Sequence, residues 1–368
     1  MKKNFLFRLS AIAMSLILVA CGGSTSEDVV ENETTAIESE ESLNVVVTTP
    51  MLGEFVKQVA GDSVVLDILM PAEADPHTYD PSPQDAAKIA DADIVLYVGI
   101  KYETSSLLKL IENTASTNAT LLEIGEEIDP IEFIDGERDH GHHDDHDEEG
   151  HDDDKDHDHD DEDGHDDHDD EDGHDDHDEE GHEGHEGHDH GSEDPHFWFD
   201  PVRVAMAVEV IKDSLVSLDP ANSSTYEANA DNFISELTDL DAQVKELIES
   251  ISEDNRKIVT THEALGYLEA RYGIEIFATI IPSLSTADEI SPSQIADVID
   301  VIEDNNIKVL FVESEAPSVY AETVVAEAGI TAVTGLYVET LKDGQTYSDF
   351  LISNVTLIVE SLNSAGEG

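Results

Sequence analysis

Histidine is distributed unevenly along this chain of 368 residues. The sequence holds 18 histidines, and 15 of them lie between His140 and His190. The other three are His77, His196 and His262. Neutral imidazole is a common ligand for zinc, copper and nickel ions, so both groups are candidates for metal binding. We expect dispersed sites from the first group and one local site from the second.

The larger group of histidines belongs to a repetitive acidic tract at 139–194. This tract carries 31 Asp and Glu residues against one Lys. It offers almost nothing to bury, so we expect it to be disordered without a ligand. A solvated spacer would explain the carboxylates but not the imidazoles, and we therefore expect many weak, exchangeable metal sites. Their histidines are His140, His142, His143, His146, His151, His157, His159, His165, His168, His174, His177, His182, His185, His188 and His190.

The three isolated histidines each lie where a predicted strand gives way to a loop. His77 lies in the motif Asp-Pro-His-Thr-Tyr-Asp-Pro, and His196 lies in Asp-Pro-His-Phe-Trp-Phe-Asp-Pro. His262 directly follows a predicted strand at 258–261. Proline fixes φ and helps to hold a loop ligand, and open α/β sheets bind ligands at the carboxyl ends of their strands. A lone histidine is more often structural, but three in this pattern predict one metal site.

Strands and helices are predicted to alternate in two series, at 43–125 and 257–362. Short β-branched runs followed by amphipathic segments are typical of parallel α/β architecture. Each series contains a helix-capping signature, Ser82-Pro83-Gln84-Asp85 in the first and Ser291-Pro292-Ser293-Gln294 in the second. The second series includes predicted helices at 264–272, 319–328 and 350–362 and a predicted strand at 331–336.

Between the two series, apolar residues recur at spacings of three and four from Tyr226 to Ile251. This stripe predicts one helix of about 25 residues, nearly 40 Å long at 1.5 Å per residue. We interpret it as a rigid strut between two lobes, and the alternative is a core helix of one lobe. The predicted fold class is α/β, with two lobes, each a parallel sheet flanked by helices.

The N-terminus has the features of an export signal. Lys2, Lys3 and Arg8 are followed by an apolar run at 9–20 that is too short to span a bilayer, as in a signal peptide. Leu-Val-Ala-Cys-Gly, ending this run, resembles the lipobox of bacterial lipoproteins and predicts lipidation of Cys21. The alternative is an ordinary signal sequence with a chance cysteine. Because the chain has no other cysteine, it can form no internal disulfide or thiolate metal site.

The protein is predicted to lie outside the cytoplasm, anchored to the membrane. Its predicted organisation has five parts. They are a signal peptide at 1–20, a lipidated, flexible acidic tether at 21–42, an N-terminal lobe at 43–200 with the insertion at 139–194, a helical segment with the strut at 201–254, and a C-terminal lobe at 255–368. The net charge of −70 excludes nucleic acid as a natural partner, because phosphates would be repelled.

Several motifs together resemble the zinc/manganese-type (cluster A-I) solute-binding lipoproteins of ABC transporters. They are the two Asp-Pro-His motifs, Thr-His-Glu-Ala-Leu-Gly-Tyr-Leu and Val-Glu-Ser-Glu at 312–315, and the resemblance covers 43–362. It implies a metal held in a cleft between two lobes by His77, His196 and His262. The family's fourth ligand is commonly Asp, and the matching position is Glu339, so either Glu339 or a water completes the shell.

The resemblance implies a monomeric zinc receptor that delivers metal to a membrane permease and is not an enzyme. An acidic, histidine-rich insertion is a feature of the zinc members, and manganese members often have Glu where this chain has His262. Manganese as the ion remains one alternative, and a metal buffer or adhesin is another. A zinc hydrolase is a third, with Glu263 as its only obvious general base, although we interpret Glu263 as a residue of a helix's first turn.

Overall fold

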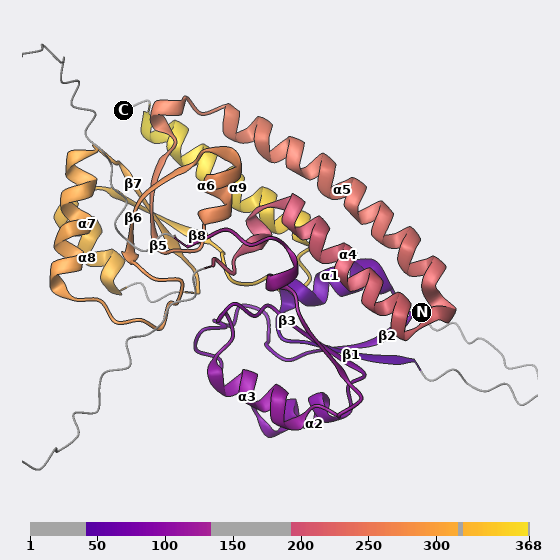
Figure 1. The fold of residues 1–368 in the computed structure, drawn as a ribbon. Coiled ribbons are helices and arrows are strands. Elements are labelled where there is room, and N and C mark those ends of the chain that lie inside the picture. Colours follow the sequence, from indigo (N-terminus) through magenta and orange to yellow (C-terminus); the bar gives the residue numbers. More distant parts are fainter. Residues whose placement is uncertain (1–41, 134–192, 316–318, 367–368) are drawn as a thin grey trace, which may run out of the picture. The chain divides into compact units, whose positions relative to one another are not determined.

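The computed structural model describes residues 42–133, 193–315 and 319–366. It contains two four-stranded parallel sheets with the same strand order, β2-β1-β3-β4 and β6-β5-β7-β8 (Figure 1). This confirms the predicted fold class. Within the described residues, no helix is both long and apolar enough to cross a membrane. The predicted signal peptide, Cys21 and the 15 histidines of the acidic tract lie outside the described residues.

The first sheet and its helices form the N-terminal lobe. Helices α2 and α3 pack on one face of this sheet through the cluster around Val46, Val95 and Ile111, and α1 packs on the other face. The elements of this lobe are β1 (Leu43–Val47), α1 (Pro50–Ala60), β2 (Val64–Ile68), α2 (Pro83–Ala90), β3 (Ile94–Tyr97), α3 (Ser105–Thr114), β4 (Thr120–Glu123) and the short 3-10 helices η1 (Gly125–Glu127) and η2 (Phe197–Phe199).

Two helices lead from the first lobe to the second, α4 (Pro201–Leu218) and α5 (Ser223–Glu249). The short 3-10 helix η3 (Pro220–Asn222) follows α4, and η4 (Glu253–Asn255) follows α5. Helix α5 has 27 residues and packs against α1 of the first lobe and against the last helix of the second. The predicted long interlobe helix is therefore confirmed. Ile251, the last residue of the predicted stripe, is buried but lies beyond the end of α5.

The second sheet carries α7 and α8 on one face, and α6 and α9 on the other (Figure 1). Both predicted capping boxes are present, at Ser82 with Asp85 and at Ser291 with Gln294. The elements of this lobe are β5 (Lys257–His262), α6 (Gly266–Tyr272), β6 (Glu275–Ile281), α7 (Pro292–Asp304), β7 (Val309–Glu313), α8 (Val319–Ala328), β8 (Thr331–Leu336) and α9 (Tyr347–Gly366).

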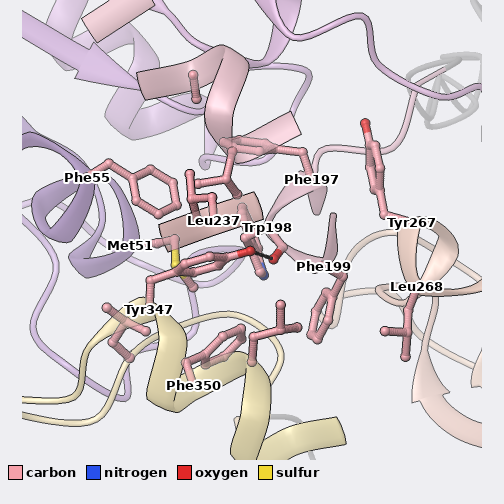
Figure 2. Packing of buried hydrophobic residues seen from close by; sticks show 14 of the residues in the cluster. Met51, Phe55, Phe197, Trp198, Phe199, Leu237, Tyr267, Leu268, Tyr347 and Phe350 are labelled. Carbon is pink, nitrogen blue, oxygen red and sulfur yellow. Dashed lines mark hydrogen bonds between the residues drawn. The ribbon is translucent and has the colours of Figure 1, made fainter. Parts of the chain in front are cut away.

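One hydrophobic core continues from the first sheet to the second. Figure 2 shows Phe55 of α1 next to Tyr347 of α9, with ring centroids 5.4 Å apart in an edge-to-face arrangement. The Tyr347 hydroxyl donates a hydrogen bond of 2.8 Å to the backbone oxygen of Trp198, drawn as a dashed line in Figure 2. Separating the two lobes would expose this shared apolar surface to water, so the core opposes any large relative movement.

We predict that Tyr347→Phe lowers the free energy of unfolding by about 1 to 3 kcal/mol, because it leaves the buried oxygen of Trp198 without this donor. Equilibrium unfolding in urea, followed by circular dichroism, measures the change. A variant as stable as the wild type would show that this hydrogen bond does not help to hold the lobes together.

Candidate metal centre

The structure brings together the three isolated histidines and Glu339. His77 lies in the loop after β2, and His196 immediately precedes η2. His262 is the last residue of β5, and Glu339 follows β8. The loops of His77, His262 and Glu339 lie at the carboxyl ends of parallel strands, which end at a common edge of each sheet. The prediction that His196 also follows a strand is wrong, because only an isolated β-bridge at Glu193 precedes it among the described residues. Each lobe thus supplies two of the four side chains.

The four side chains form a compact cluster. One nitrogen or oxygen atom from each lies within 4.8 Å of the others. The nearer Glu339 oxygen, Oε1, lies 3.4 Å from Nε2 of both His77 and His196, and 2.6 Å from Nε2 of His262. The side chains of His196, His262 and Glu339 are fully buried, whereas that of His77 is 3% exposed.

The polar atoms at the centre of this cluster make no well-directed hydrogen bond among the described residues, although Glu339 Oε1 and Nε2 of His262 are in close contact. They are Nε2 of each histidine and both carboxylate oxygens of Glu339. Buried polar atoms are almost always hydrogen-bonded, and five exceptions at one point need a reason. A metal ion ligated by these atoms would supply it, since imidazole nitrogen and carboxylate oxygen are common zinc ligands. The cluster is therefore suited to hold one metal ion.

Two further carboxylates orient two of the imidazoles. Asp194 Oδ1 lies 2.8 Å from Nδ1 of His196, and Glu313 Oε2 is hydrogen-bonded to Nδ1 of His262. A carboxylate at Nδ1 fixes the ring so that Nε2 faces the metal position, as in many metal proteins. His77 differs, because within the described residues no carboxylate lies at its Nδ1. Its ring packs edge-to-face against Tyr102, with centroids 5.1 Å apart.

The two Asp-Pro-His motifs fold in the same way around their aspartates. Asp75 Oδ1 accepts a hydrogen bond of 2.9 Å from the backbone of His77, and Asp194 Oδ1 accepts one of 2.8 Å from the backbone of His196. The sequence predicted no role for these aspartates or for Glu313. A carboxylate two residues before each histidine was the available signal for the aspartates. Nothing local to the motif at 312–315 showed that Glu313 would reach His262.

First-lobe side chains hold the segment that carries Glu339. The Tyr102 hydroxyl donates to the backbone oxygen of Glu339 at 3.0 Å, and Trp198 Nε1 donates to that of Val338 at 2.7 Å. On the other side, Oε1 of Glu315 accepts a hydrogen bond of 3.4 Å from the Glu339 amide. The position of this carboxylate therefore depends on contacts from both lobes.

Charge and burial have opposite effects on the imidazoles. Burial alone would lower the pKa of His196, but the carboxylates of Glu339 and Asp194 outweigh it and raise that pKa to about 9. Burial also disfavours the charged form of His262, yet Glu313 and Glu339 raise its pKa well above the ordinary value. Without a metal ion, these two rings therefore hold protons that balance the buried carboxylates.

The two glutamates near the centre behave differently from each other. Burial would raise the pKa of Glu339, but the imidazoles of His196 and His77 hold it well below its usual range. Burial, together with the nearby charge of Glu339, raises the pKa of Glu315 to about 8. Glu339 is thus the carboxylate at this centre that stays charged near neutral pH, while Glu315 keeps its proton.

Glu263, the general base expected of a hydrolase, is not part of the cluster. Its carboxylate accepts a hydrogen bond of 3.1 Å from the hydroxyl of Thr279 on β6. The expectation that Glu263 belongs to the first turn of a helix is wrong, because α6 begins at Gly266. Residues 264 and 265 remain in the loop that carries the chain away from β5.

Known proteins resemble this chain over most of its length. A manganese-binding lipoprotein, MntA of Halalkalibacterium halodurans, is 25% identical over 98% of this chain and 99% of its own. The zinc-binding lipoprotein AdcA of Streptococcus pneumoniae is 31% identical over the whole of this chain, which spans 62% of AdcA. The iron ABC transporter substrate-binding lipoprotein MtsA of Streptococcus pyogenes is 25% identical over 98% of this chain and 99% of its own.

A solved structure shares the fold. The periplasmic zinc-binding protein TroA of Treponema pallidum superposes with a TM-score of 0.67 at 21% identity, covering 86% of this chain and 98% of its own. Residues 45–361 match the family described as zinc-uptake complex component A, periplasmic. This match over most of its length shows that the chain belongs to the ZnuA family.

Proposed function

We propose that this protein is an extracytoplasmic zinc receptor that delivers its ion to the membrane permease of an ABC transporter. His77, His196, His262 and Glu339 are the proposed ligands. The observation that carries this proposal is the convergence of five buried polar atoms that make no well-directed hydrogen bond among the described residues. The ion is the cargo of the protein, held between the two lobes until it is passed on.

Zinc fits the chemistry of the four ligands. Three imidazole nitrogens and one carboxylate suit tetrahedral Zn²⁺, whereas Mn²⁺ prefers more oxygen ligands. The similarity to AdcA, named as a zinc-binding protein, also supports zinc. Manganese is the second candidate, because the relative matched along nearly the whole of both chains, MntA, is named for manganese. A bidentate Glu339 with added waters would provide the extra oxygens.

Family membership argues against the other classes considered above. The relatives are named as metal-binding lipoproteins, and MtsA is named as the substrate-binding lipoprotein of an ABC transporter, which supports a transport component and not a hydrolase. We further propose a lipid anchor at Cys21, which matches the word lipoprotein in the names of these relatives. The histidines of the acidic tract are proposed to hold metal weakly near the receptor and to raise its local concentration.

Replacing one proposed ligand tests the site directly. We predict that His262→Ala weakens zinc binding at the tight site by more than about 100-fold. This exceeds the loss of about 10 to 100-fold in metal affinity that is typical when a residue hydrogen-bonded to a ligand is removed. His165→Ala, the same change within the acidic tract, should leave the tight site unaltered. Titration against a zinc-competing fluorescent chelator measures both. Equal affinity in His262→Ala and wild type would contradict the ligand assignment.

Removing the tract separates its role from that of the cluster. We predict that a chain lacking 139–192 keeps one tight zinc site and loses the weak ones. The deletion should be tolerated, because the two ends of the tract are already held together by backbone contacts. Glu132 and Glu193 form an antiparallel β-bridge, and the Asp194 amide donates a hydrogen bond of 3.0 Å to the backbone oxygen of Ile131. In the same titration, manganese at equal concentration should not displace zinc. Displacement would make the protein a manganese receptor, and loss of the tight site would move the function to the tract.

Metal binding should also depend on pH. The pKa of His196 is raised to about 9 in the metal-free protein, so this ring is protonated at neutral pH and must lose its proton to bind zinc. We predict that affinity rises with pH up to about pH 9, by about tenfold per unit for each displaced proton. Calorimetric titration in buffers of different ionisation enthalpy counts the protons. Binding without proton release would contradict the charged state of the metal-free site.

A further inference from the structure

His77 is the least constrained of the four side chains at the centre. It lies in the loop between β2 and α2, whereas His262 belongs to a central strand and His196 adjoins a buried 3-10 helix. Carboxylates orient the rings of His196 and His262 through Nδ1, whereas the ring of His77 is held by edge-to-face packing, and no carboxylate of the described residues lies at its Nδ1. Because the lobes share a core, an ion can leave most readily where one loop moves, and this loop is the one that carries His77.

The loop of His77 is tied to the opposite lobe by two hydrogen bonds. The Thr286 hydroxyl donates to Asp75 Oδ2 at 2.7 Å, and the Tyr337 hydroxyl lies 3.5 Å from Glu73 Oε2, at the limit of a hydrogen bond. The shorter bond joins a buried threonine to a carboxylate whose other oxygen accepts from the backbone of His77. One aspartate thus connects the second lobe to the backbone of the His77 ligand.

Thr286 is held firmly on its own side. It lies between β6 and α7, and the residue is only 4% exposed. The loop is closed by hydrogen bonds from the amides of Ser285 and Ala287 to the hydroxyls of Ser283 and Ser285, at 3.1 and 3.2 Å. The Thr286 hydroxyl is therefore presented to Asp75 by a loop with its own internal bonds.

We propose that Thr286 is a positioning residue, and that its hydrogen bond to Asp75, called the latch below, retains the bound ion by keeping the His77 loop closed. This inference rests on the proposed metal-binding function. Breaking the latch frees Asp75 Oδ2 and lets the loop move His77 away from the other three ligands. In this proposal the ion enters before the latch forms, so the latch acts on release. The dissociation rate should therefore change more than the association rate.

The test compares zinc dissociation from the full-length chain and its Thr286→Val variant. Stopped-flow mixing of the zinc-loaded protein with excess EDTA separates a fast phase from weak sites and a slow phase of one equivalent. Thr286→Val removes the hydroxyl at nearly constant volume, and we expect the slow phase to accelerate about tenfold, as for loss of a hydrogen bond to a charged group. Association should stay within about twofold of wild type, while Thr286→Ser, which keeps the hydroxyl, should restore slow release.

Thr279→Val is the matched control, because Thr279 is also buried in the second lobe and donates to a carboxylate, that of Glu263, within that lobe. It should leave the slow phase unchanged. In an Asp75→Ala background, adding Thr286→Val should cause no further acceleration, because the acceptor is already gone.

The outcomes distinguish the latch from the function on which it rests. A wild-type slow phase that Thr286→Val leaves unchanged would overturn the latch alone. Equal acceleration by Thr279→Val, or additive effects in the Asp75→Ala background, would also overturn it by showing general loosening. A wild-type chain with no slow phase at all would overturn the proposed tight site, and the latch with it.

Discussion

The buried carboxylate of Glu339 is the constraint on which the centre depends. A charged group removed from water needs a partner of opposite charge, and three imidazoles surround this one. Protons on His196 and His262 provide the balance in the metal-free protein, and a divalent cation would provide it in the loaded one. Near neutral pH the site therefore contains positive charge in both states, and metal binding would exchange protons for an ion.

The proposed metal centre and the packing of the lobes are linked through the backbone at 338–339. Trp198 and Tyr102 of the first lobe hydrogen-bond this segment of the second, and Tyr347 returns a bond to the backbone of Trp198. Moving the lobes apart would leave several buried donors and acceptors unpaired, at about 1 to 3 kcal/mol each. Moving the His77 loop leaves these backbone bonds between the lobes in place, and breaks the bond to Thr286 and the ring contacts of His77. Local loop motion is thus the less costly way to open the centre.

Sequence patterns predicted the features of the fold that depend on residues close together in the chain. The alternation of strands and helices, the capping boxes at Ser82 and Ser291 and the helix at 319–328 follow from nearest neighbours along the chain, and the structure contains them. The family resemblance directed attention to Glu339, which no local pattern singles out. Contacts across the lobes, such as Glu313 with His262 or Thr286 with Asp75, join residues 51 and 211 positions apart. Such pairs are set by topology, and neither partner carries a local signal of it.

The two Asp-Pro-His motifs show how one local structure serves two purposes. In both, the aspartate caps the backbone of its histidine, so the motif itself explains the common geometry. Their remaining contacts differ, because Asp194 also binds its own histidine ring, whereas Asp75 reaches the opposite lobe. Asp194 consequently fixes a proposed ligand, His196, and Asp75 makes the position of His77 depend on a second loop. A site built from one fixed and one movable copy of the same motif can hold an ion firmly and still release it without separating the lobes.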